Sequence, residues 1–131
     1  MESGLGIHQK LLLIFLCSDN KVTLDPIRIM KGLFVFAMET PPTWLPEGSF
    51  YKFVPYYYGP YSPQVYSDLT YLEARGYLGS INNPGRSWKS YSPTDEGVEM
   101  AQVIAATLDP RITKYLKKFA NSLLGRHLDN C

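Results

Sequence analysis

The sequence is poor in cysteine and histidine, with two residues of each. Cys17 and Cys131 lie far apart in the chain, which excludes a dense disulfide framework and makes a reducing cytoplasm the expected setting. His8 and His127 are also far apart, so no spacing typical of a metal site is present. Glycine-rich phosphate-binding motifs and nucleophile motifs are absent as well. We therefore expect no metal site, no cofactor, no catalytic residues and no enzymatic activity.

The sequence also lacks a long apolar run. The longest, Leu11–Cys17, spans seven residues, whereas a membrane-spanning helix needs about 20. Lys10 precedes this run, as a basic residue does in a signal peptide. However, Leu16 stands where a lipoprotein signal has a small residue, and no small-residue cleavage site follows. We expect a cytoplasmic protein with no membrane partner.

Net charge is low, at +1, so the whole chain favours neither nucleic acid nor an acidic membrane. The charge is unevenly distributed, however. Between Pro110 and Arg126 the chain carries five basic residues and no acidic one, which leaves −4 on the remainder. An amphipathic helix predicted at residues 111–124 has one apolar face, which suits pairing with a second copy. We therefore predict a homodimer formed through this basic helix.

What the sequence does have is a dense aromatic stretch from Phe50 to Tyr77, which holds most of its 10 tyrosines. The first part alternates aromatic with other residues, which predicts an extended segment. Residues 58–61 (YGPY) predict a sharp turn, because glycine permits positive φ and proline presets φ. Ser62 and Pro63 then have the residue types of an N-cap and a first helical residue, so a helix is expected over residues 63–75.

This helix is predicted to be amphipathic. Val65, Leu69 and Leu72 share its apolar face, and Gly76 suits its C-terminal stop. The opposite, polar face is predicted to carry Gln64, Ser67, Asp68, Tyr71 and Arg75.

Periodicity and cap residues predict four further helices and a β-hairpin, which together make an α+β fold. An almost wholly apolar helix at residues 5–18 is expected at the centre. A second helix runs from Pro26 to about Met38 and is expected to be covered on most sides, and the loop 40–49 is expected to lie against the aromatic stretch. Strands at 77–81 and 88–92 form a hairpin with a polar tip, and helices at 94–108 and 111–124 follow.

Three helices, a hairpin and a further helix form the order of a winged-helix domain, whose third helix enters the DNA major groove beside the hairpin, or wing. The chain also resembles small prokaryotic winged-helix proteins that carry a Y-G-P-[YF]-S signature. The matching residues are Tyr57–Ser62 with the leucine and glycine pattern of Val65–Leu78, and Tyr91–Gly97 at the exit from the wing. Panacea-type antitoxins are similar in the Y-G-P turn, and MarR- and PadR-like regulators in the later pattern.

The resemblance covers residues 8–106. It implies a winged-helix domain over residues 1–108, with 109–131 as a C-terminal helical extension that serves dimerisation. The chain departs from the pattern between the second and third helices, where an ordinary helix-turn-helix has a turn of about 3–4 residues. Here 23 residues, Glu39 to Tyr61, separate them. We expect this insertion to fill the space beside the third helix with aromatic side chains.

The leading functional prediction is sequence-specific binding of duplex DNA in transcriptional control. Glutamine and arginine on the third helix match the hydrogen-bonding edges of adenine and guanine, and basic residues on a wing suit backbone phosphates. The predicted DNA contacts are Gln64, Ser67, Tyr71, Arg75, Arg86 and Lys89. Asp68 and Glu73 oppose this function, because carboxylates repel phosphates.

The alternative is a protein-interaction module, because tyrosine is enriched at protein interfaces. The predicted partner contacts are Tyr56, Tyr58, Tyr61 and Tyr71. The resemblance to antitoxins implies a toxin as the partner. Two other interpretations of the tyrosines stay open: stacking on the bases of a single strand, and an aromatic satellite core beneath the proline-rich loop.

Overall fold

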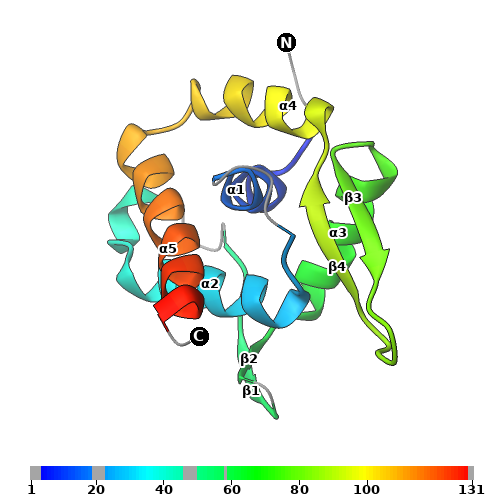
Figure 1. Cartoon of the computed structure of the whole chain (residues 1–131). Helices are drawn as coiled ribbons and strands as arrows, with labels where there is room; N and C mark the ends of the chain where they lie inside the picture. Colours follow the sequence, from blue (N-terminus) through cyan, green and yellow to red (C-terminus); the bar gives the residue numbers. More distant parts are fainter. Residues whose placement is uncertain (1–3, 19–22, 46–49, 58, 130–131) are drawn as a thin grey trace.

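The computed structural model describes residues 4–18, 23–45, 50–57 and 59–129, with side chains as far as residue 121. Within these residues the chain forms five α-helices, one 3-10 helix and two antiparallel hairpins (Figure 1). Their bounds are α1 Ile7–Leu16, α2 Pro26–Glu39, η1 Pro42–Trp44, β1 Val54–Tyr56, β2 Gly59–Tyr61, α3 Pro63–Ala74, β3 Leu78–Asn82, β4 Lys89–Pro93, α4 Asp95–Ala105 and α5 Pro110–Asp129. The predicted α+β class is confirmed, and the order of elements is compatible with a winged helix.

α1 occupies the centre of the molecule. Figure 1 shows this helix end-on, with α2, α4, α5 and the β3–β4 hairpin arranged around it. Every side chain from Leu11 to Leu16 is buried, because the helix has neighbours on all sides and therefore needs apolar residues around its whole circumference. The predicted central, buried helix is confirmed.

α2 begins as predicted, with the Asp25 carboxylate accepting a hydrogen bond from the Arg28 amide at 2.9 Å. The expectation that neighbours cover most of this helix is wrong near its C-terminal end, where Met38 is 67% exposed. The neighbouring elements cover only the face that carries Ile29, Leu33 and Phe36, all of which are buried. A helix can therefore carry apolar side chains on two faces while neighbouring elements bury only one of them.

α3 carries the predicted buried face, and Val65, Leu69 and Leu72 are fully enclosed. It ends as predicted at Gly76, whose φ of 84° allows the last carbonyls to accept hydrogen bonds from the following amides. The capping role predicted for the Ser62 hydroxyl is wrong. Ser62 stands at the N-cap position, but its side chain accepts no hydrogen bond from the helix, and its amide points to the sulfur of Met30 at 3.4 Å.

β3 and β4 form the predicted hairpin, with pairs running from Leu78–Pro93 to Asn82–Lys89 and a polar tip. Leu24, just before α2, pairs with Tyr91 of β4: the Leu24 amide donates to the Tyr91 carbonyl (2.9 Å) and its carbonyl accepts from the Tyr91 amide (2.8 Å). This bridge ties the start of α2 to the hairpin.

A second hairpin, absent from the sequence prediction, lies in the insertion before α3. β1 and β2 pair antiparallel, with Val54 opposite Tyr61 and Tyr56 opposite Gly59. The predicted turn at residues 58–61 is therefore wrong, since Gly59–Tyr61 is a strand and the described chain turns at Tyr57. Proline in both strands conceals the hairpin in the sequence, because proline is rare within sheets.

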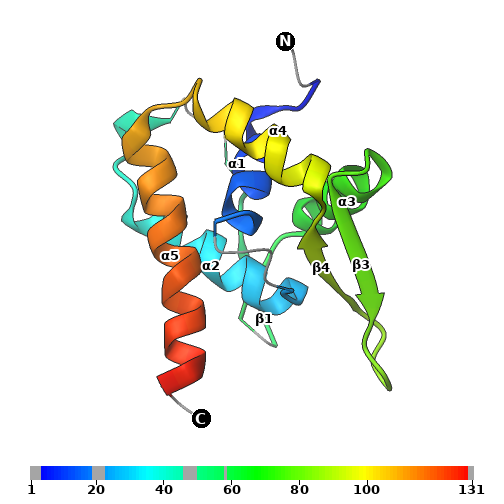
Figure 2. The same ribbon diagram turned by 45° about the horizontal axis from the view of Figure 1, so that its top comes forward.

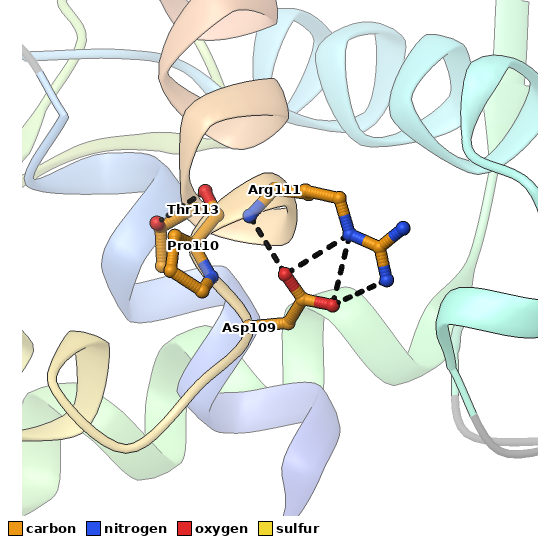
Figure 3. A network of polar contacts seen from close by, with 4 residues as sticks. All are labelled: Asp109, Pro110, Arg111 and Thr113. Carbon is orange, nitrogen blue, oxygen red and sulfur yellow. Dashed lines mark hydrogen bonds and ion pairs between the residues drawn. The ribbon is translucent and has the colours of Figure 1, made fainter.

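The described part of the proline-rich loop, residues 40–45, packs against α5, a contact that the sequence did not predict. The Trp44 ring of η1 lies 4.9 Å from the Tyr115 ring, and the Arg111 guanidinium lies 4.6 Å above Trp44. Figure 3 shows Asp109 accepting hydrogen bonds from the side chain and amide of Arg111. These bonds hold the pKa of Asp109 below its ordinary value and fix the cation over the ring.

Two helix ends differ from the sequence prediction. α4 ends at Ala105 rather than near Leu108, because the amide and hydroxyl of Thr107 both donate to the Ile104 carbonyl (2.9 and 2.7 Å) and tighten the chain. α5 continues to Asp129 rather than 124, because no proline follows Pro110 to interrupt it. In Figure 2 its last turns extend beyond α2.

Gly97 marks a close approach between α4 and the start of β3. A Cβ at this position would lie 2.0 Å from the Tyr77 carbonyl oxygen. The Thr94 hydroxyl strengthens the same junction, since it accepts from the Gly97 amide (3.0 Å) and donates to the Gly76 carbonyl (2.6 Å). Glycine is therefore required where the chain passes from β4 into α4.

We expect Gly97→Ala to lower the free energy of unfolding by about 3 kcal/mol, because the methyl group forces two backbone segments apart. Thermal or urea unfolding of the purified chain measures this effect. Gly79→Ala is the matched control, since a Cβ there meets no atom within 4 Å. Equal stabilities of the two variants would contradict the close approach.

Candidate functional site

A cleft lined with aromatic residues lies between the two hairpins. Both hairpins project toward the same end of the molecule, and the starts of α2 and α3 lie between them (Figure 1). The cleft has a volume of about 370 Å³, within the range of about 300–1,000 Å³ for ligand sites. Its lining, here called the aromatic cleft, consists of Ile27, Met30, Tyr56, Gly59, Pro60, Tyr61, Tyr66, Ser87 and Trp88.

Three tyrosine rings form a continuous series along this cleft. Tyr56 and Tyr61 are diagonal neighbours on one face of the β1–β2 hairpin, and their rings stack at 4.9 Å and 30°. The Tyr66 ring of α3 lies 5.9 Å from that of Tyr61. Outside the cleft, Tyr57 extends the series with its ring 5.2 Å from Tyr56. Exposed fractions of 56% for Tyr56 and 91% for Tyr57 leave an aromatic patch open to solvent.

Burial is the main cause that raises the pKa of Tyr66, and the neighbouring Tyr61, Tyr91 and Asp25 add to it. Its hydroxyl therefore stays protonated at neutral pH and keeps its hydrogen-bond donor. The cleft thus combines apolar ring surface with a polar group that can orient a bound segment.

Charged side chains surround the aromatic cleft, and most of them are basic. The stem of Lys31 packs against Gly59, with its Cε 3.4 Å from the place of a Cβ there. The Arg86 guanidinium lies 5.3 Å over the Trp88 ring. Asp25, just before α2, is the acidic neighbour. A second hollow of about 380 Å³, lined by Asp25, Ile27, Asn83, Pro84, Arg86 and Trp88, continues the cleft toward the hairpin tip.

The DNA contacts predicted on α3 share its exposed side. Gln64, Ser67, Tyr71 and Arg75 are all exposed, as are Thr70 and Ala74, which were not among the predicted contacts. Arg75 is engaged within this face, since its Nη1 donates to the Tyr71 hydroxyl at 2.6 Å and its guanidinium lies over the Tyr71 and Tyr77 rings. Ser67 donates weakly to the Pro63 carbonyl at 3.5 Å. The face therefore offers one cation, already held by tyrosine.

The two predicted wing contacts lie apart from that face. Lys89 Nζ stands 4.0 Å from the Glu73 carboxylate, which also accepts from the Ser80 hydroxyl. Arg86 lies near the hairpin tip, over Trp88. Glu73, which belongs to α3, thus partly offsets the charge of Lys89, while Arg86 lies with Trp88 beside the aromatic cleft.

The placement predicted for Asp68 is wrong. It was assigned to the polar face of α3, but it is only 6% exposed and accepts hydrogen bonds from Tyr51 Oη (2.7 Å) and Gln9 Nε2 (3.0 Å). Its position is at the border of the apolar stripe, where helical spacing alone does not decide burial. Burial, followed by this hydrogen bond, raises the pKa of Tyr51. Asp68 therefore anchors the insertion on α3 and does not face a ligand.

The predicted partner contacts are only partly brought together. Tyr56 and Tyr61 line the aromatic cleft, whereas Tyr71 lies on the other side of α3 beside Arg75. Tyr58 lies outside the described residues. The sequence analysis did not identify Met30, Tyr66 and Trp88 as residues of the site. The one sequence feature that could have indicated the site was the large ring of Trp88 next to a polar turn.

On the C-terminal helix, Lys114, Lys117 and Lys118 are exposed, and Arg111 is paired with Asp109. Ile112, Leu116 and Ala120 are buried, so the first half of α5 belongs to the core. A homodimer formed through this helix stays a prediction.

Cys17 does not have the properties of a nucleophilic cysteine. Burial raises the pKa of the Cys17 thiol to about 12, and its Sγ contacts the Gly97 carbonyl at 3.7 Å. A thiol with so high a pKa is a poor nucleophile. Among the described residues, no group of three His, Cys, Asp or Glu side chains could hold a metal ion.

No protein-family model matches this chain, and no curated protein is significantly similar to it. In the part of the chain that the structure describes, no helix has both the length and the apolar character to span a membrane.

We expect Asp68→Ala to destabilise the protein by about 1–3 kcal/mol, because the buried Tyr51 hydroxyl loses its acceptor. Urea unfolding measures the change. Glu99→Ala, at an exposed position of α4, is the control and should alter stability by less than about 0.5 kcal/mol. If the two variants unfold at the same urea concentration, the anchoring role of Asp68 is wrong.

Proposed function

We propose that this chain is a winged-helix module that binds a protein partner through the aromatic cleft. The observation that carries the proposal is the cleft itself, with Tyr56, Tyr61 and Tyr66 in series and Trp88 contributed by the second hairpin. Tyrosine and tryptophan are enriched at protein interfaces and among the residues that contribute most binding energy. A partner would also cover the exposed rings of the β1–β2 hairpin.

The winged-helix part of the proposal is supported by topology. α1, α2 and α3 precede the β3–β4 hairpin, and Leu24 pairs with β4 in the place of a third short strand between the first two helices. The insertion between α2 and α3 adds the β1–β2 hairpin beside this arrangement. In the proposed module, the inserted hairpin and the wing form the two walls of the binding site.

Duplex DNA binding in transcriptional control is the second candidate function. It is favoured by the exposed side of α3, with Gln64 and Ser67, and by the exposed basic residues Arg86 and Lys89 on the hairpin. It ranks lower because DNA-reading helices bring more basic residues than this one, whose Arg75 is engaged with Tyr71. A toxin partner, which the resemblance to antitoxins implies, belongs to the first candidate and stays a prediction.

Site-specific photo-cross-linking in cells tests the partner proposal. A benzoyl-phenylalanine at position 57 should capture one recurrent protein, because Tyr57 is 91% exposed beside the cleft. The same group at Val103, which is 50% exposed, should not capture it, because Val103 belongs to α4, a helix at the end of the molecule opposite the two hairpin tips in Figure 1. Tyr56→Ala should abolish the cross-link from position 57. Capture that is equal at both positions and insensitive to Tyr56→Ala would contradict the proposal.

Binding of random-sequence duplex DNA at about 50 and 200 mM salt separates the two candidates. The partner proposal predicts no measurable affinity even at the lower salt. A protein that contacts 6–10 phosphates would instead lose about 10³–10⁵-fold in affinity across this range. Such a loss would establish the DNA candidate, provided that Arg75→Ala and Arg86→Ala weaken binding and the control Lys117→Ala does not.

A further inference from the structure

We propose that the aromatic cleft holds an extended, proline-containing and acidic segment of the partner. This inference rests on the proposed function and adds the chemistry of the partner at that site. Three features carry it: the edges of the β1–β2 hairpin, the lining of the cleft, and the charges around it.

The edges of the β1–β2 hairpin cannot accept a further strand. Pro55 and Pro60 stand directly opposite each other in the register, and neither residue has an N–H group. They must therefore form a non-hydrogen-bonded pair, in which the backbone groups point outward to the two free edges. The middle of each edge offers a carbonyl but no amide donor, which prevents strand addition. A partner has to bind through the side chains of this hairpin.

The aromatic lining of the cleft, which has a volume of about 370 Å³, suits an extended segment. An extended segment inserts one or two side chains at a time, and left-handed polyproline segments bind grooves lined by aromatic residues. Tyr56, Tyr61 and Trp88 provide such a lining.

The ring faces favour a peptide over a single-stranded nucleic acid. Bases bind by stacking on free aromatic faces. Here Tyr56 and Tyr61 already stack on each other at 4.9 Å, and the Arg86 guanidinium covers a face of Trp88 at 5.3 Å. These contacts each cover one face of a ring, which reduces the surface on which bases could stack, while the tyrosine hydroxyl groups suit the backbone carbonyls of a proline-containing segment.

The charges around the aromatic cleft favour an acidic segment. Lys31 and Arg86 are the basic residues and Asp25 is the acidic residue that the described chain places beside the cleft, and the Asp25 carboxylate is itself engaged with the Arg28 amide. Complementary charge raises the association rate and selects against partners of the wrong sign. Acidic residues beside the prolines would pair with these cations.

Selection of random 12-residue peptides displayed on phage against the intact chain tests the inference. The enriched peptides should contain proline and carry net negative charge. Synthetic copies should bind about tenfold more weakly to Tyr56→Ala, and several-fold more weakly when salt rises from about 50 to 200 mM. Tyr71→Ala, the same change on the other side of α3 and outside the cleft, should alter the affinity by less than about twofold.

The outcomes separate failure of this inference from failure of the proposed function. Enriched peptides that are neutral, basic or patterned as amphipathic helices, and still depend on Tyr56, would overturn the inference and leave partner binding standing. Displacement of the peptides by a 12-nucleotide oligo-dT that binds more tightly would also overturn it. If no peptide is enriched that depends on Tyr56, both the inference and the proposed function fail.

Discussion

The aromatic cleft depends on one buried hydrogen bond, from the Tyr51 hydroxyl to the Asp68 carboxylate at 2.7 Å. It fixes the insertion onto α3, while Phe50 packs on Phe36 and Phe53 on Phe34, with ring centres 5.3 and 5.6 Å apart. The residues just before β1 are thus attached to two helices of the core. A buried carboxylate is stable only when it is hydrogen-bonded, so this contact determines which side chains meet. Ring packing alone would not determine them. The β1–β2 hairpin then emerges beside the start of α2, where it forms one wall of the cleft.

Most of the helical framework could be predicted from the sequence, because its signals are local. The apolar circumference of α1, the buried stripe of α3 and the stop at Gly76 each follow from periodicity or backbone preference within a few residues. The cleft could not be predicted in this way. It joins Met30, Tyr56 and Trp88 from three separate parts of the chain. A local sequence pattern does not predict which side chains so far apart in the chain come into contact. Asp68 and Ser62 were misassigned for the same reason, since tertiary partners decide what their polar atoms do.

The distribution of charge explains why partner binding is favoured over DNA. Two of the three cations predicted to meet DNA are engaged with the protein's own polar groups: Arg75 with Tyr71, and Lys89 with Glu73. Such contacts on the surface are weak, so they lower rather than abolish the capacity for phosphate binding. The aromatic surface, by contrast, is left uncovered by the described chain, and exposed aromatic rings gathered around a cleft are typical of interaction sites.

Hydrogen–deuterium exchange of the chain, alone and with the partner captured by cross-linking, tests the central claim most directly. The proposed function predicts slower exchange in the β1 and β2 strands and at residues 86–89, the two walls of the aromatic cleft, with unchanged exchange over the exposed side of α3. Protection confined to α3 or to α5, with the two hairpins exchanging as in the free protein, would contradict it. In that case the aromatic cleft would not be the surface through which this protein acts.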